Sequence, residues 1–282
     1  MYRIILFYKF IDVHDPHKLQ AEQKALCEKL NLKGRMLIAH EGINATFEGK
    51  IEDIESYKKT VQGNVLFADI VFKESEGTGK GFSKLKIKVR DEVVTLAAGK
   101  FDVQKETATA ITADEFEALY TNNEDFVVLD LRNDYEIKAG YFERTVNPQL
   151  QNFRDLPAKV AELSHLKDKK VIAVCTGGIR CEKATCLLKK EGFTDLYQLQ
   201  DGIHTYIERY PANRFKGSLF VFDNRMTTPV VETEGREIVG QCIYCGVRCE
   251  EFYSDDTVTP SRKVISCSVC AQHNAAILRK CA

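Results

Sequence analysis

The fold of the middle of the chain is decided by the stretch Val171-Ile172-Ala173-Val174-Cys175-Thr176-Gly177-Gly178-Ile179-Arg180-Cys181-Glu182-Lys183-Ala184. Its first four residues are apolar and mostly β-branched, which predicts a buried parallel strand. A turn with two glycines follows, and a helix is expected to begin directly after it. At such a junction, backbone N–H groups and the positive end of the helix dipole attract an anion. The stretch therefore predicts an anion-binding loop that starts with a cysteine.

Cys175 is the candidate nucleophile of this loop. Its thiol should ionise easily, because the amides of the loop and the Arg180 guanidinium stabilise a thiolate or an oxyanion. The loop residues expected to cradle the anion are Thr176, Gly177, Gly178 and Ile179. The simpler alternative is a buried structural cysteine beside a tight turn.

The length of the loop separates two kinds of cysteine chemistry. Sulfur carriers form a persulfide and cysteine phosphatases form a phosphocysteine, and both use a cysteine in such a cradle. A phosphatase loop places five residues between the cysteine and the arginine, whereas only four separate Cys175 from Arg180. The smaller ring favours a terminal sulfur over a phosphate.

The elements around the loop predict a parallel α/β domain over residues 107–213. Thr112 and Glu115 form a capping box before a short helix, and residues 126–130 and 196–199 read as further strands. Strands that alternate with helices are typical of a parallel sheet. Three charged residues, Asp130, Arg132 and Glu136, come at the carboxyl end of one strand, where ligand sites of such sheets gather. We expect them to brace the loops and not to react.

The cysteines near the loop leave two interpretations open. Cys181 can resolve a persulfide or form a regulatory disulfide with Cys175, or it can be a packing residue at the start of the helix. Cys186 and Cys27 fall on apolar positions and are expected in the core.

Residues 1–95 predict a separate α+β domain. Strands are expected at residues 2–10, 35–39, 43–48, 66–73 and 84–90, with helices after Asp15-Pro16 and from Ile51. The order β-α-β-β-α-β with an extra strand is that of a ferredoxin-like fold. The segment 76–81 resembles a phosphate-binding P-loop but lacks its first glycine and its final Ser or Thr, so a flexible loop is expected.

The last predicted strand of this domain is basic on one side. Strict alternation places Leu85, Ile87 and Val89 toward the core and the four cations, Lys84, Lys86, Lys88 and Arg90, on the other face. The cations repeat at about 7 Å, which suits a phosphate backbone. A solvated sheet face without a ligand is the alternative.

Residues 236–282 form a cysteine-rich tail. Cys242-x-x-Cys245 and Cys267-x-x-Cys270 supply four thiolates, which suit a tetrahedral structural Zn²⁺ site, and the 21 residues between the pairs are one more than is usual for this pattern. Cys249 and His273 are possible substitute ligands, and free or redox-active thiols are the alternative. A module this short needs a metal to supply part of its folding free energy.

Composition limits the class of protein. A chain of 282 residues is long enough for about two domains, and its net charge of -1 means that nucleic-acid binding must rest on a local basic patch. No segment approaches the ~18 apolar residues of a membrane span, and the N-terminus lacks a signal peptide. Ten cysteines in an unexported chain favour metal binding, catalysis and core packing in a reducing cytosol.

The ordered motifs resemble those of a known family. Asp130-x-Arg132-x-x-x-Glu136, the Cys175 loop and Leu199-x-Asp-Gly202-Ile203 resemble a rhodanese domain. Together with Gly42-Ile43-Asn44, Phe153-Arg154-x-Leu156-Pro157 and Phe220-Val221-Phe222-Asp223-x-Arg225, they resemble the rhodanese-related tRNA uridine hydroxylases over nearly the whole chain. The expected fold class is thus multidomain α/β: a ferredoxin-like α+β domain, a rhodanese-like parallel α/β domain and a small cysteine-rich C-terminal module.

The resemblance implies a tRNA modification enzyme. The expected reaction is oxygen-dependent hydroxylation at C5 of the wobble uridine, position 34, with molecular oxygen as co-substrate, the tRNA anticodon loop as partner and Cys175 as the essential residue. In this light the basic strand becomes a candidate tRNA contact. A persulfide sulfurtransferase that acts on a small thiol or protein is the second hypothesis, and a non-catalytic tRNA-binding adaptor is the third.

Overall fold

The computed structural model describes residues 1–211, 213–230 and 237–281. The chain separates into two compact units, Met1–Leu96 and Ala97–Ala282. Residues 212, 236 and 282, which fall in the predicted domain ranges, lie outside the described part. In the ranges that the structure describes, we find no helix with the length and apolar content to cross a membrane.

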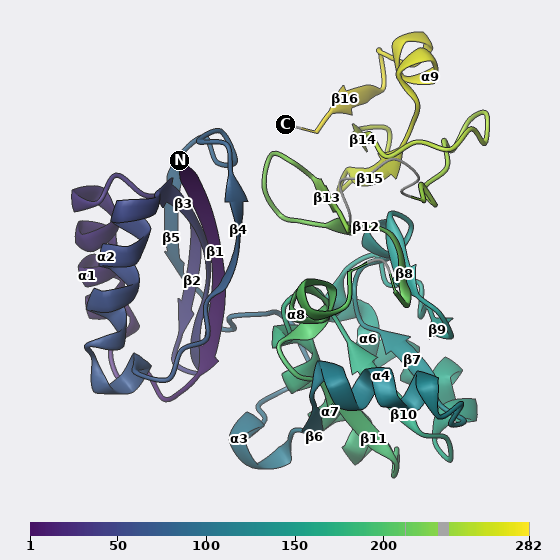
Figure 1. The fold of residues 1–282 in the computed structure, drawn as a ribbon, viewed down its shortest axis with the longest axis horizontal. Coiled ribbons are helices and arrows are strands. Elements are labelled where there is room, and N and C mark those ends of the chain that lie inside the picture. The colour runs from purple at the N-terminus through teal and green to yellow at the C-terminus, as the bar shows by residue number, and fades with distance from the viewer. Residues whose placement is uncertain (212, 231–236, 282) are drawn as a thin grey trace. The chain divides into compact units, whose positions relative to one another are not determined.

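The first unit is a sheet with two helices on one face (Figure 1). Its sheet has the order β4-β1-β3-β2-β5, in which β2 and β5 are parallel and the other neighbours antiparallel. The elements are β1 (Tyr2–Phe10), α1 (Pro16–Lys29), β2 (Lys33–Ala39), β3 (Gly42–Lys50), α2 (Ile51–Gln62), the 3₁₀ helix η1 (Val65–Phe67), β4 (Lys73–Gly77) and β5 (Leu85–Val89). This arrangement confirms the ferredoxin-like fold with one extra strand, β5.

Local sequence explains both helices of this unit. The Asp15 side chain accepts a hydrogen bond from the amide of Lys18, and Pro16 occupies the first turn, so α1 begins where a cap and a fixed φ coincide. In α2 the apolar side chains recur at helical spacing, and Tyr57 packs edge-on against Phe47 with ring centroids 5.4 Å apart. These contacts close the core between the helices and the sheet.

The predicted strand at residues 66–73 is wrong. Residues 65–67 form the 3₁₀ helix η1, and the strand begins only at Lys73. The Asn64 side chain accepts from the amide of Leu66, which caps a helical turn. Phe67, the last residue of η1, and Ile70, which follows the helix, both enter the core. The cap therefore overrides the strand propensity of the apolar run.

The glycine-rich segment 76–81 does bind an anion, but the anion belongs to the chain itself. The amides of Thr78, Gly79 and Gly81 donate to the carboxylate of Glu48 over 2.8–2.9 Å. Glu48 lies on β3 and is only 3% exposed. The expected flexible loop is thus held in place by hydrogen bonds to a buried charge.

The basic strand lies at an edge of the sheet, as β5. Leu85 and Ile87 pack against the core, while Lys84, Lys86, Lys88 and Arg90 are exposed. The neighbouring strand β2 places the exposed Arg35 opposite Lys86. The basic face is therefore broader than the sequence of one strand indicated.

The second unit is built on a five-stranded parallel sheet of order β6-β11-β10-β7-β9. Its first part contains α3 (Val103–Glu106), β6 (Thr109–Ile111), α4 (Ala113–Thr121), β7 (Val127–Asp130), α5 (Asp134–Ile137), β8 (Gly140–Phe142), β9 (Thr145–Val146), η2 (Phe153–Asp155), α6 (Leu156–Lys159), η3 (Val160–Leu166), β10 (Val171–Val174), α7 (Ile179–Lys190), β11 (Leu196–Leu199) and α8 (Gly202–Arg209). This sheet confirms the predicted parallel α/β fold.

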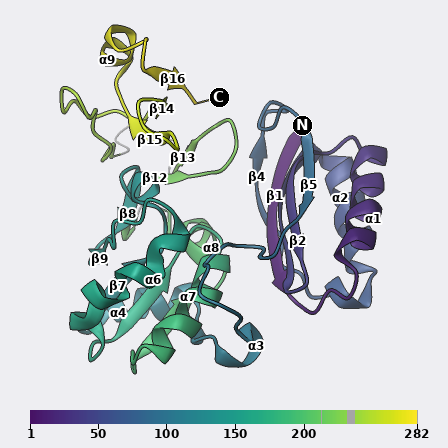
Figure 2. The same ribbon diagram turned by 180° about the vertical axis from the view of Figure 1, so that it is seen from behind.

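Strand β10 lies in the middle of the sheet and is buried on both sides. Ile172 and Val174 belong to the core cluster that contains Phe116 of α4 and Tyr206 of α8. Helix α7 contacts β10 and β11, and α3 lies beside α7 (Figure 2). The single turn of α3 directly precedes the range 107–213 that was predicted for this domain. Burial on both faces explains why the β10 sequence is a continuous apolar run.

The remainder of the second unit is a small β module. It contains β12 (Phe215–Phe220), β13 (Thr227–Pro229), β14 (Phe252–Asp255), β15 (Arg262–Ile265), α9 (Ser268–His273) and β16 (Leu278–Lys280). Strand β12 pairs with β8 and β13, and β14 pairs with β15 and β16. Phe220 and Phe252, with ring centroids 5.1 Å apart, join the two parts in one core cluster.

Candidate active site

The Cys175 loop connects the end of β10 to the start of α7. Gly178 has φ of 99°, a conformation that favours glycine, and it precedes the first residue of the helix. Helix α8 fixes the loop from the other side, because the amide of Ile203 donates to the Cys175 carbonyl over 2.9 Å. A Cβ on Gly202 would come within 2.6 Å of that same carbonyl oxygen, so only glycine fits there. The motif Leu199-x-Asp-Gly202-Ile203 thus contacts the Cys175 loop directly through Gly202 and Ile203.

The loop stabilises Cys175 as a thiolate. The amide of Gly178 donates to its Sγ over 3.2 Å, and the residue is fully buried. Burial acts to raise the pKa of the thiol, but the hydrogen bond from the Cys181 thiol, the Arg180 charge and the amides at the start of α7 together lower this pKa to about 6. A lowered pKa at a strand-to-helix turn is typical of a reactive cysteine.

Arg180 is held by a buried ion pair. Its guanidinium donates to both carboxylate oxygens of Glu136, over 2.6 and 2.9 Å, and also to the Thr176 hydroxyl. Burial works to lower the pKa of Arg180, but the charge and hydrogen bonds of Glu136 raise it well above its ordinary value. The arginine is therefore a permanent cation with a fixed orientation. Glu136 supports it, as the sequence suggested for this residue.

Asp130 and Arg132 form a second buried pair. The guanidinium binds both oxygens of Asp130, and it also donates to the Gly140 carbonyl over 2.7 Å. Both side chains are fully buried. These contacts tie the end of β7 to β8, which is the bracing expected from the sequence, and no substrate-facing role is needed to explain them.

The other thiols differ from Cys175 in their environment. Burial raises the pKa of Cys181 well above its ordinary value, and its hydrogen bond to Cys175 raises it further. Cys181 is thus a proton donor beside the thiolate, which leaves both of its predicted roles open. Burial raises the pKa of Cys186 to about 11 and that of Cys27 to about 12, in keeping with core positions.

Phe222 also belongs to this site, although its sequence pattern did not predict a functional role. Its ring lies over Arg180, with the guanidinium carbon 5.7 Å from the ring centroid. Although it is a large apolar residue, its exposure is 42%. The motif that contains it, Phe220-Val221-Phe222-Asp223-x-Arg225, indicated only the family resemblance. Alternation with the buried Phe220 is the signal that could have placed the two rings on one side of the chain.

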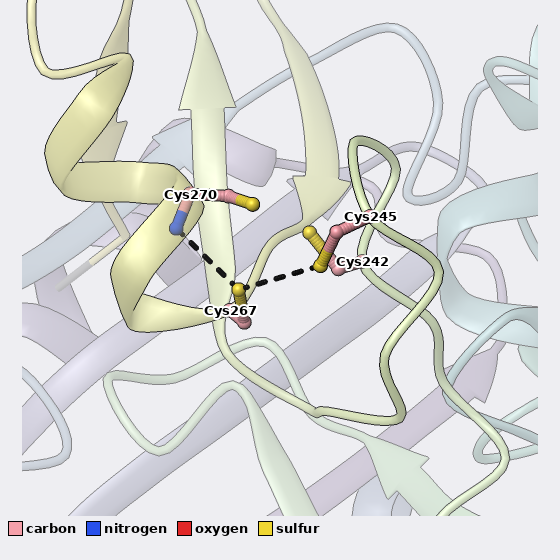
Figure 3. A group of neighbouring side chains, drawn as sticks. All are labelled: Cys242, Cys245, Cys267 and Cys270. Carbon is pink, nitrogen blue, oxygen red and sulfur yellow. Dashed lines mark hydrogen bonds between the residues drawn. The ribbon is translucent and has the colours of Figure 1, made fainter.

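The structure brings together the four cysteines of the tail. The sulfur atoms of Cys242, Cys245, Cys267 and Cys270 all lie within 4.8 Å of one another (Figure 3). A tetrahedral Zn²⁺ site with Zn–S bonds of about 2.3 Å has sulfur–sulfur edges of about 3.8 Å. The distance from Cys245 Sγ to Cys267 Sγ is 3.8 Å. The donor set and its size therefore fit zinc.

The two possible substitute ligands, Cys249 and His273, lie apart from the four sulfur atoms. Among the described residues, Cys249 and His273 are not part of the four-sulfur group. Cys249 is buried in the core cluster with Phe220 and Phe252, and the His273 Nδ1 atom lies 3.0 Å from the Val269 carbonyl. Two zinc knuckles, Cys242-x-x-Cys245 and Cys267-x-x-Cys270, therefore supply a complete set of four thiolates without them.

The thiolate state of Cys175 predicts a pH dependence of alkylation. Because the thiolate is the nucleophile, the rate with iodoacetamide should rise as the pH rises through the pKa of about 6. For an ordinary cysteine, the midpoint of the alkylation rate would lie at about pH 8.5. Arg180→Gln should move the midpoint upward, because a cation beside the sulfur is lost. Peptide mass spectrometry of the Cys175 peptide measures both rates; a wild-type midpoint at pH 8 would contradict the proposed environment.

The parallel sheet, the four-residue loop between Cys175 and Arg180 and the α8 turn define the second unit as a rhodanese-class domain. Residues 112–209 match the rhodanese-like domain family, residues 2–93 the UPF0176 acylphosphatase-like domain and residues 216–282 the rhodanese C-terminal family. A rhodanese-related protein from Thermoplasma volcanium is 27% identical over 36% of this chain and 93% of its own, with a TM-score of 0.31.

Similarity to whole proteins extends over both units. The tRNA uridine(34) hydroxylase of Aster yellows witches'-broom phytoplasma is 37% identical, over 97% of this chain and 88% of the relative. The protein of the same name from Listeria welshimeri is 40% identical, over 89% of this chain and 79% of the relative. The chain belongs to the tRNA uridine(34) hydroxylase family.

Proposed function

We propose that this chain hydroxylates C5 of the wobble uridine, position 34, of tRNA and uses molecular oxygen as co-substrate. The observation that carries the proposal is the buried Cys175 sulfur, which accepts a hydrogen bond from the Gly178 amide and has a lowered pKa, in a chain of this family. We place the reaction in the cytoplasm, where tRNA is found and where a reactive thiol is kept reduced.

The thiolate can activate C5 of the uracil by bonding to the neighbouring carbon, C6. Addition of Cys175 Sγ to C6 of uracil moves an electron pair toward C5 and the C4 carbonyl, which gives an electron-rich enolate that reacts with oxygen. The charge that develops is stabilised by the fixed Arg180 cation and the loop amides. One oxygen atom becomes the C5 hydroxyl. The other becomes water, with two protons and two electrons from a two-electron reductant, and loss of the C5 proton releases the thiolate.

The test is product formation from purified components. Wild-type protein, tRNA with uridine at position 34 and a thiol reductant are incubated in air and under nitrogen, and the nucleosides are separated by mass spectrometry. We expect 5-hydroxyuridine in air only. A parallel assay offers thiosulfate and a thiol acceptor; turnover there, without a modified nucleoside, would instead support a persulfide sulfurtransferase.

We propose that the basic face of β5 binds the phosphates of the anticodon arm. Lys84, Lys86, Lys88 and Arg90 are exposed along one edge strand. The target base already lies in a single-stranded loop, so little pairing energy opposes its exposure to the enzyme.

Replacing two of these lysines should change the salt dependence of tRNA binding. In Lys86→Ala/Lys88→Ala protein, the magnitude of the slope of log K against log salt should fall by about 1–2. Fewer phosphates are then neutralised on binding, so fewer counterions are released. Filter binding over a salt series measures the slope. The matched control removes two exposed lysines of α1, Lys24→Ala/Lys29→Ala. Equal slopes in all three proteins would exclude β5 as a phosphate contact.

We propose that Cys242, Cys245, Cys267 and Cys270 hold a structural Zn²⁺. When bound, the ion supplies a cross-link between the two knuckles, and its binding free energy becomes folding free energy of the module. Among the described residues, no histidine or carboxylate joins this four-sulfur group, so we assign it no part in the chemistry.

Removing one ligand should release the metal. Native mass spectrometry of wild-type protein should show one zinc per chain. Loss of a residue that only hydrogen-bonds to a metal ligand lowers metal affinity by about 10- to 100-fold. Cys245→Ser removes a ligand itself, so zinc affinity should fall by more than this. Cys281→Ser, outside the four-sulfur group, should keep the metal. Hydrogen exchange after chelation should increase in β14–β16 and stay low in β10. Metal-free wild-type protein with a fully protected module would contradict the proposal.

A further inference from the structure

We infer that Phe222 is the platform on which the target uracil stacks at the Cys175 loop. The inference rests on the proposed function, and it assigns to one aromatic residue the task of positioning the base. Phe222 follows the end of β12 and lies over the arginine of the loop (Cζ of Arg180 to ring centroid, 5.7 Å).

The exposure of Phe222 is not explained by packing. Its neighbour in the motif, Phe220, is only 1% exposed and serves the core, whereas Phe222 is 42% exposed. Leaving a phenylalanine ring in water forfeits part of the burial free energy that such a side chain normally supplies. Its position beside a buried cation of the active loop gives the ring a second use, as a surface for a planar ligand.

The turn after β12 holds the ring in a defined place. The amide of Val221 donates to the Met226 carbonyl over 2.8 Å, and the amide of Met226 donates to the Asp223 carbonyl over 3.0 Å. The Arg225 guanidinium binds both carboxylate oxygens of Asp223. A ring on such a turn is ordered before the ligand arrives, so little entropy is lost on stacking.

The cysteine-rich module is connected to the Phe222 ring through Phe220 and Phe252. Phe222 packs edge-on against Phe220, with centroids 5.2 Å apart, and Phe220 packs against Tyr135 and Phe252 at 5.1 Å. Cys242 lies in the core cluster that contains Phe220 and Phe252. A row of aromatic contacts therefore connects the four-cysteine group to the base platform, and gives the module a positioning role.

The ligand class follows from the chemistry of the surface. A phenylalanine ring has a π face and no hydrogen-bonding group, so it holds a base by stacking and leaves base selection to other groups. Stacking of one base on an aromatic side chain changes affinity by about 5- to 140-fold. Because the Arg180 guanidinium lies over one face of the Phe222 ring, an uncharged planar pyrimidine would stack on the opposite face.

The test compares two anticodon stem-loop RNAs, one with uridine at position 34 and one abasic there. Full-length wild-type protein should bind the uridine RNA about 5- to 140-fold more tightly than the abasic RNA. Phe222→Ala and Phe222→Leu should lose most of this ratio, and Phe222→Trp should keep it. The control is Tyr141→Ala, at an aromatic residue of β8 with 37% exposure, which should keep the wild-type ratio.

Two further readouts separate positioning from folding. The alkylation midpoint of Cys175 should stay near 6 in Phe222→Ala, and KM for tRNA should rise more than kcat falls. A uridine-to-abasic ratio that is unchanged in Phe222→Ala, or restored by Phe222→Leu, would overturn the inference. Because binding is measured without turnover, the ratio is informative even if no 5-hydroxyuridine forms, which would overturn the proposed function alone.

Discussion

Cys175→Ser protein is expected to form 5-hydroxyuridine at least about a thousandfold more slowly than wild type, because a serine hydroxyl is not ionised in this loop and cannot replace the thiolate as nucleophile. The loop amides and the Arg180–Glu136 pair do not depend on the sulfur, so tRNA binding should be retained. Nucleoside mass spectrometry over a time course, at saturating tRNA, measures the rate.

The matched control is Cys186→Ser. This buried residue of α7 lies 3.1 Å from the Glu182 carbonyl, a contact that serine can keep, and its raised pKa marks it as unreactive. We expect near wild-type activity. Comparable activity in Cys175→Ser and wild type would mean that oxygen is activated without the thiolate, and would remove the basis of the mechanism.

Glu136→Ala is expected to lower the free energy of unfolding by about 3–5 kcal/mol, because it leaves the Arg180 guanidinium buried without its counter-charge. The Glu136 side chain is fully buried and that of Arg180 is 8% exposed, so water cannot replace the lost partner. Urea unfolding, followed by a probe in the second unit, measures the effect.

A surface pair provides the control for this second prediction. Glu162→Ala removes the partner of Lys159 in an exposed pair three residues apart. Such pairs contribute little, because solvent screens both charges. If Glu136→Ala and Glu162→Ala unfolded at the same urea concentration, the Arg180–Glu136 pair would not be the support that holds the loop.

Features defined by local sequence could be predicted. The Cys175 loop combines a strand, a turn and a helix start within fourteen residues, so pattern and chemistry point to the same place. The knuckles Cys242-x-x-Cys245 and Cys267-x-x-Cys270 are likewise local, and the structure brings their sulfurs together. The loop residues lie within a few positions of each other, as do the two cysteines of each knuckle, although 21 residues separate one knuckle from the other.

Features that depend on distant partners could not be predicted. The carboxylate that orders the glycine-rich segment comes from Glu48, about thirty residues upstream. The Phe222 ring contacts Arg180, although Arg180 comes forty-two positions earlier in the chain. The error at residues 66–73 has another cause, since a single Asn64 cap decided between strand and 3₁₀ helix. Propensity is a weak guide where one side chain can cap a turn.

The central claim is that the Cys175 thiolate directs an oxygen atom from molecular oxygen to C5 of uridine 34. The most direct test is mass spectrometry of the nucleoside at position 34 after reaction in isotopically labelled oxygen gas, with wild-type and Cys175→Ser protein. We predict that wild type gives 5-hydroxyuridine that carries the label and that the variant gives unmodified uridine. Unlabelled 5-hydroxyuridine from wild type, or labelled product from Cys175→Ser, would contradict the account.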